Sequence, residues 1–124
     1  MRAFASGLLV LATFSGIAAA ESKNNLLLDT RFVSMDAKVT EAQCLAKAKT
    51  ALSTVLKGSA KLEIKAGTHA QQASTANAVF QVECLQYNKV SGAYVVATLQ
   101  AGNGQDGSNM AKGTEAIAAA LKAP

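Results

Sequence analysis

Two cysteines, forty positions apart, constrain the fold of this chain more than any other feature. Cys44 lies on the apolar stripe of a segment with helical periodicity, and Cys84 lies on the apolar face of a segment that alternates like a strand. A disulfide between them would place a helix and a strand in one buried layer, because both side chains must point into that layer. Two buried free thiols are the alternative.

The first twenty residues indicate which of these two states to expect. A positive start at Met1-Arg2 precedes a mainly apolar run, which closes on Ala18-Ala19-Ala20 before the chain turns polar at Glu21. This order is typical of a secretory signal peptide at residues 1–20. Export to an oxidising compartment, the periplasm or the exterior, favours a disulfide over free thiols.

Cleavage after Ala20 would leave one domain, residues 21–124, with a net charge of +3 from eleven basic and eight acidic side chains. Retention of the apolar run 3–20 as an anchor is the alternative, although Ser, Thr and Gly dilute it. The mild positive charge is only weak evidence for a nucleic-acid partner. The absence of Trp argues against one, because aromatic side chains provide the surfaces on which bases stack. We therefore expect no nucleic-acid partner, and no membrane contact once the signal peptide is removed.

Hydrophobic periodicity predicts the element order β-α-β-β-β-α. Strands are expected over 26–37, 61–66, 79–87 and 93–100, and helices over 41–57 and 108–122. The small, polar stretch 67–77 is typical of a loop. Short connections suit an antiparallel meander of the last three strands, which the first strand joins through a helical crossover. The predicted fold is α+β, a four-stranded, mainly antiparallel sheet with two helices packed on one face.

The helix over 41–57 carries the strongest local signals. Thr40 and Gln43 match a capping box at its start, and Gly58 is the expected C-cap. On the sheet, alternation places the more apolar residues toward the helices. The opposite face is expected to carry Lys61, Glu63, Lys65, Gln81, Glu83, Tyr94, Val96 and Thr98. Tyr94, Val96 and Tyr87 could form a small contact surface there for a partner or a dimer.

Few side chains are candidates for chemistry. His69, the only histidine, could act as an acid or base if Asp29, Asp36 or Glu63 approached it, but a solvated loop residue is the simpler interpretation. Lysines concentrated in mid-chain favour a solvated surface over an anion-binding patch; they are Lys47, Lys49, Lys57, Lys61 and Lys65. The glycine-rich residues 102–108 match neither phosphate-binding motif and hold a single acidic residue, so a plain connection is expected.

The two cysteine segments also carry a resemblance. Ala42-Gln43-Cys44-Leu45 in the helix and Val82-Glu83-Cys84-Leu85 in a strand, with the export signal and a final Ala-rich helix, resemble small exported proteobacterial proteins of an uncharacterised family. The resemblance spans most of the chain after residue 20 and rests on the two cysteines and the element order. It implies no activity and no catalytic residue.

These observations favour an exported, disulfide-stabilised, non-enzymatic module that binds a protein or a small ligand. We expect no catalytic residue, no cofactor and no metal site, and only Cys44 and Cys84 as residues with an assigned role. One alternative is a periplasmic inhibitor of a hydrolase that uses the loop 67–77 as a wedge. Another is a small hydrolase that uses His69 with a carboxylate.

Overall fold

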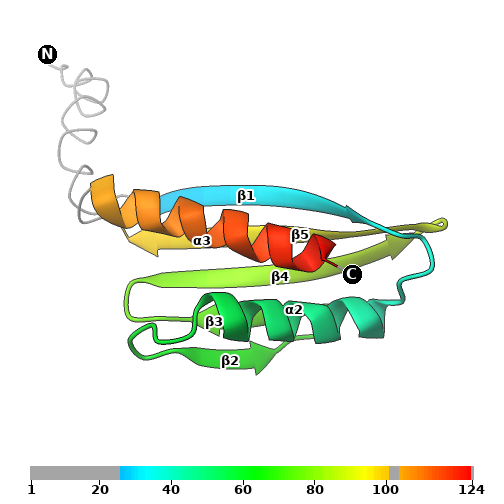
Figure 1. The fold of residues 1–124 in the computed structure, drawn as a ribbon, viewed down its shortest axis with the longest axis horizontal. Coiled ribbons are helices and arrows are strands. Elements are labelled where there is room, and N and C mark those ends of the chain that lie inside the picture. Colours follow the sequence, from blue (N-terminus) through cyan, green and yellow to red (C-terminus); the bar gives the residue numbers. More distant parts are fainter. Residues whose placement is uncertain (1–25, 101–103, 124) are drawn as a thin grey trace, which may run out of the picture.

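The computed structural model describes residues 26–100 and 104–123, and it has two helices on one face of a five-stranded antiparallel sheet (Figure 1). The strand order is β1-β5-β4-β3-β2. The elements in chain order are β1 (Leu26–Met35), α2 (Glu41–Val55), β2 (Glu63–Ala66), β3 (Ala70–Ser74), β4 (Ala78–Tyr87), β5 (Val90–Gln100) and α3 (Gly104–Lys122). The predicted signal peptide, residues 1–20, lies outside the described residues.

The prediction of four strands is wrong, because part of the expected loop 67–77 is β3. β3 pairs with β2 on one side and β4 on the other, and its Ala73 is fully buried opposite Phe80. Pairing with two neighbours outweighs the weak strand propensity of its Ala, Gln and Ser residues. For the hydrolase-inhibitor hypothesis, only the shorter connections 67–69 and 75–77 remain as candidates for the wedge.

Helix α2 begins as predicted and ends earlier than predicted. Thr40 Oγ1 accepts a hydrogen bond from Gln43 N at 3.1 Å, and Gln43 Oε1 accepts one from Thr40 N at 2.9 Å, which completes the capping box. The last helical residue is Val55, with Leu56 as the C-cap, so the prediction of a helix to residue 57 was two residues too long. Gly58 still reverses the chain, with a φ of +85° that favours glycine.

The hairpin between β4 and β5 is tighter than the predicted turn over 88–92. Asn88 and Lys89 alone form the turn, with φ of +54° and +67°, and Tyr87 pairs directly with Val90. Positive φ at both central residues matches the twist of the flanking strands. β5 consequently starts at Val90, three residues earlier than expected.

Helix α3 also starts earlier than expected, at Gly104 rather than at residue 108.

The core lies between the sheet and the helices. Helix α2 packs on β4 and β3, helix α3 packs on β5 and β1, and the two helices run antiparallel to each other (Figure 1). The inward alternation of β4 and β5 is confirmed by the burial of Phe80, Val82, Cys84, Ala93, Val95, Ala97 and Leu99. Ala66, at the end of the short edge strand β2, is exposed. Among the described residues, no helix combines the length and apolar character needed to cross a membrane.

The predicted disulfide is present. Cys44 in α2 is bonded to Cys84 in β4, with 6.0 Å between their Cα atoms, and both residues are buried. The bond joins the first turns of α2 to a strand in the interior of the sheet. It therefore fixes α2 on the sheet face that the alternation pattern predicted.

Candidate functional site

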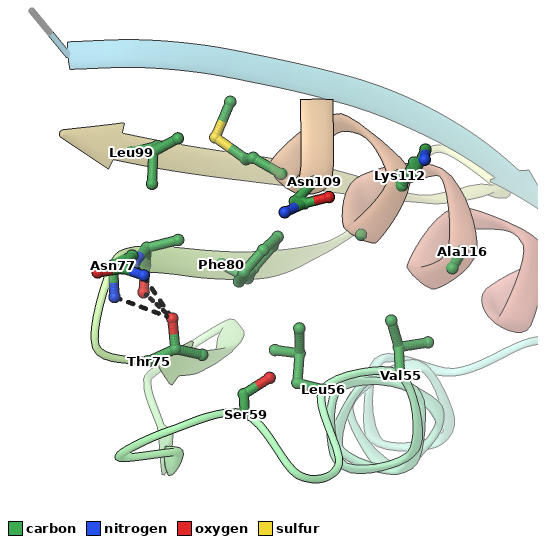
Figure 2. A pocket seen from close by; sticks show the side chains of 13 residues that line it. Val55, Leu56, Ser59, Thr75, Asn77, Phe80, Leu99, Asn109, Lys112 and Ala116 are labelled. Atoms are coloured by element: carbon green, nitrogen blue, oxygen red, sulfur yellow. Dashed lines mark hydrogen bonds between the residues drawn. The ribbon is translucent and has the colours of Figure 1, made fainter. Parts of the chain in front are cut away.

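A pocket of about 420 Å³ opens between the two helices at one end of the sheet (Figure 2). The end of α2, the first half of α3, the turn between β3 and β4, and the paired ends of β4 and β5 surround it. Its lining residues are Val55, Leu56, Ser59, Thr75, Asn77, Ala78, Phe80, Leu99, Asn109, Met110, Lys112, Gly113 and Ala116. Pockets of this size accommodate small organic molecules.

The inner wall of this pocket is apolar. Phe80 from β4, Leu99 from β5 and Met110 from α3 are all buried in the core and border the cavity. In Figure 2 the Phe80 ring stands at the centre, with Leu56 and Val55 on the side of α2. The wall would bury an apolar group without leaving one of its own polar atoms unpaired.

The rim of the pocket is polar. Ser59 follows the turn at the end of α2, Asn77 lies in the β3–β4 turn, and Asn109 and Lys112 lie on α3. Thr75 Oγ1 holds the β3–β4 turn by accepting hydrogen bonds from the backbone N of Ala78 at 3.1 Å and of Asn77 at 3.4 Å. The rim thus offers hydroxyl and amide groups, plus one ammonium group, around an apolar interior.

Among the described residues that line the pocket, Lys112 is the only charged one. The described lining residues include no carboxylate, histidine or cysteine. The geometry of the pocket is suited to holding a molecule with an apolar body and a polar or anionic end.

His69 lies elsewhere, in the connection between β2 and β3. Its Nδ1 is 2.8 Å from Glu41 Oε2, and the side chains of His69 and Glu41 are 59% and 38% exposed. The predicted partners Asp29, Asp36 and Glu63 are not the ones that bind it. The sequence held no signal for Glu41, because the pairing depends on how α2 lies beside this connection.

The mid-chain lysines do not gather into one patch. Lys49, Lys57 and Lys61 are exposed, and Lys65 Nζ lies 3.7 Å from Glu63 Oε1 on the edge strand β2. Lys47 has a separate role, because its Nζ donates to Leu121 O at 3.3 Å and to Ala123 O. Lys47 therefore satisfies carbonyl groups at the end of α3.

A second polar cluster joins β1 to α3. The hydroxyl of Thr114, fully buried in α3, donates to Asp29 Oδ2, and Arg31 Nε lies 3.4 Å from the same oxygen. Pairing with a cation and a hydroxyl offsets the cost of burying part of the carboxylate. The cluster is structural, since its three side chains satisfy one another.

Part of the glycine-rich stretch 102–108 can be placed. Residues 102 and 103 lie outside the described residues, and from Gly104 onward the stretch belongs to α3.

Nowhere in residues 26–100 and 104–123 do three His, Cys, Asp or Glu side chains come close enough to hold a metal ion.

Comparison of the chain with known protein families, with curated proteins and with solved structures gives no match. The resemblance to small exported proteobacterial proteins of an uncharacterised family therefore stays a prediction. The sequence did not predict the pocket, because the residues that line it come from five segments that no sequence motif connects.

Proposed function

We propose that this protein is an exported, non-enzymatic binding module that holds a small amphipathic molecule in the pocket between α2 and α3. The observation that carries the proposal is the lining of the pocket, which combines a buried apolar wall with a polar rim and a single charge. The Cys44–Cys84 bond supports the exported part of the proposal, because disulfides form and persist in oxidising compartments.

The preferred ligand class follows from the arrangement of the wall and the rim. An alkyl or aromatic body would replace water against Phe80, Leu99 and Met110, and this burial would provide most of the affinity. The Lys112 ammonium and the Asn109 amide would bind an anionic end at the rim. A fatty carboxylate is the simplest molecule with this chemistry.

The test uses decanoate and decanol as probes, which share an alkyl chain and differ in the charge of the head group. We expect calorimetric titration of the exported protein to show binding of both probes, with decanoate the tighter. Lys112→Met should weaken decanoate by about fivefold, the loss of one charge-assisted hydrogen bond, and leave decanol unchanged. Lys122→Met, at the exposed far end of α3, is the matched control and should change neither affinity.

A second variant tests the location of the site. Ala116 is exposed on the wall of the pocket, so Ala116→Phe would fill the cavity without disturbing the core. We expect this variant to fold and to lose both probes. Absence of binding by the unmodified protein, or equal binding by Ala116→Phe, would contradict the proposal.

The pair His69–Glu41 supports a second candidate function, a small hydrolase, because a carboxylate can orient an imidazole as a base. In the described part of the chain, the His69 side chain has its hydrogen bond to Glu41 and none to a hydroxyl or thiol nucleophile. If the protein hydrolyses any of a panel of esters, amides, phosphate esters and glycosides, His69→Ala and Glu41→Gln should abolish that activity. The proposed binding function predicts no turnover and unchanged decanoate affinity in both variants.

A further inference from the structure

In the part of the chain that the structure describes, no element covers the sheet face opposite the helices, and the charge on its strands is confined to Glu83 in β4 and to Glu63 and Lys65 in the edge strand β2. Alternation and register place the outward side chains of β1, β5 and β4 on this face, in rows such as Phe32–Tyr94–Glu83 and Leu28–Thr98–Val79. From residue 28 to 34 in β1 and from residue 90 to 98 in β5, no outward side chain is charged. Glu83 is the only charged outward residue of β4.

This face also carries every large apolar side chain that is exposed in the described residues. We call these seven residues the outer patch: Leu28, Phe32, Val79, Leu85, Tyr87, Val90 and Tyr94. Their exposed fractions, 37% to 81%, add up to nearly four fully exposed side chains. At roughly 200 Å² for each residue, the seven residues of the outer patch together expose about 750 Å², above the roughly 300–600 Å² of the largest apolar patch on a typical monomer.

The densest part of the outer patch lies at the β4–β5 hairpin. The Phe32 ring packs edge-to-face with Tyr94, at 5.1 Å between ring centroids, and covers Gly92, where a Cβ atom would lie 2.6 Å from Phe32 Cζ. Beside this ring is a hollow of about 360 Å³ bordered by Leu85, Val90 and the hairpin turn. Tyr87, 81% exposed, projects at its border. A projecting aromatic residue beside a hollow is a self-complementary shape.

Both edges of the sheet disfavour pairing with another strand. The edge strand β1 has Asp29 and Arg31 on its helix-facing side, where they join Thr114 of α3. The opposite edge strand, β2, is four residues long and exposes the Glu63–Lys65 ion pair. Inward-facing charges, short edge strands and exposed charges all hinder edge-to-edge association. The outer patch, by contrast, is an apolar surface without inward-facing charges or a free strand edge.

We propose that a second copy of this chain covers the outer patch, with the two sheets stacked face to face about a two-fold axis. A typical stable interface buries about 800 Å² on each partner, close to what the outer patch offers. A face with few charged side chains selects a partner by shape more than by charge, and an identical apolar face matches it at every outer-patch residue, with Glu83 as the one β4 carboxylate beside it. In the dimer, Tyr87 of each copy fills the hollow of the other.

The test is the oligomeric state of the exported protein, purified after its natural processing and with the disulfide intact. We expect sedimentation equilibrium to show a dimer at low micromolar concentration, with a dissociation constant that salt does not weaken. Tyr87→Glu should raise this constant at least 100-fold, because each dimer would bury two unpaired carboxylates. Thr50→Glu adds the same charge on the exposed side of α2 and should leave the dimer intact.

Val90→Glu, at the position paired with Tyr87, is an independent second variant in case Tyr87→Glu disturbs the hairpin. Circular dichroism of both variants would show whether the fold is retained. A protein that remains monomeric up to 100-fold above the low micromolar range would overturn the proposal. So would a dimer that persists unchanged in both folded variants, because it would then use another surface.

Discussion

At the scale of single residues, Lys47 shows how one side chain can connect two elements. It lies in α2, yet its ammonium group donates to carbonyl oxygens at the end of α3, 74 and 76 positions further along the chain. The last carbonyl groups of a helix have no partner within that helix, and a cation at this end also interacts favourably with the helix dipole. Lys47 therefore acts as a C-terminal cap supplied by a neighbouring helix.

This role predicts that Lys47→Met lowers the free energy of unfolding by about 1 kcal/mol, since the aliphatic stem is kept and only the hydrogen bonds are lost. Urea denaturation measures the change. Lys49→Met, at an exposed position on the same helix, is the matched control and should alter stability by less than about 0.5 kcal/mol. Equal losses in the two variants would show that Lys47 contributes only general surface charge.

At the scale of elements, the disulfide stabilises the region of the fold that contains β3. Helix α2 packs on β3 and β4, and the Cys44–Cys84 bond attaches its first turns to β4. β3 has few large apolar side chains of its own, and it depends on β2, β4 and the helix above it. The cross-link therefore supports an element whose sequence alone gives it little stability.

Loss of the disulfide should be costly. Cross-linking residues 40 positions apart restricts the unfolded chain, so Cys44→Ala/Cys84→Ala should lower the free energy of unfolding by about 4 kcal/mol in the chain-entropy model. The measurement is urea denaturation of the double variant beside the oxidised and the reduced wild-type protein. We expect the reduced protein and the variant to lose similar amounts. Unchanged stability in both would contradict the entropic account.

At the scale of the whole molecule, the two faces of the sheet have different roles. One face, with α2 and α3, contains the core, the disulfide and the amphipathic pocket, and the other carries the outer patch. Within the described residues helices cover one side of the five-stranded sheet, and the second face of such a sheet can meet water or a partner. The proposed ligand site and the proposed dimer surface are thus on opposite sides, and the two tests are independent.

Processing and redox state are also properties of the whole molecule. We predict that the exported protein starts at Glu21 and is lighter than the reduced chain by two hydrogens, because the disulfide forms after export. Intact-mass measurement without reductant tests both statements at once. A mass that retains residues 1–20 would refute cleavage after Ala20, and a mass with both thiols free would refute the disulfide.

Local patterns were sufficient for much of the fold. The capping box at Thr40 and Gln43, the inward alternation of β4, and the apolar placement of Cys44 and Cys84 were all predicted and are confirmed. Each of these signals depends on neighbours two to four positions away, so the sequence carries it directly.

The tertiary structure decided the rest. Residues 70–74 became a strand because two neighbouring strands offered them hydrogen bonds, against their own weak propensity. Glu41 reached His69, Lys47 reached the end of α3, and five separate segments came together around the pocket. Such contacts between distant residues depend on how the elements pack, and no short stretch of sequence encodes that packing.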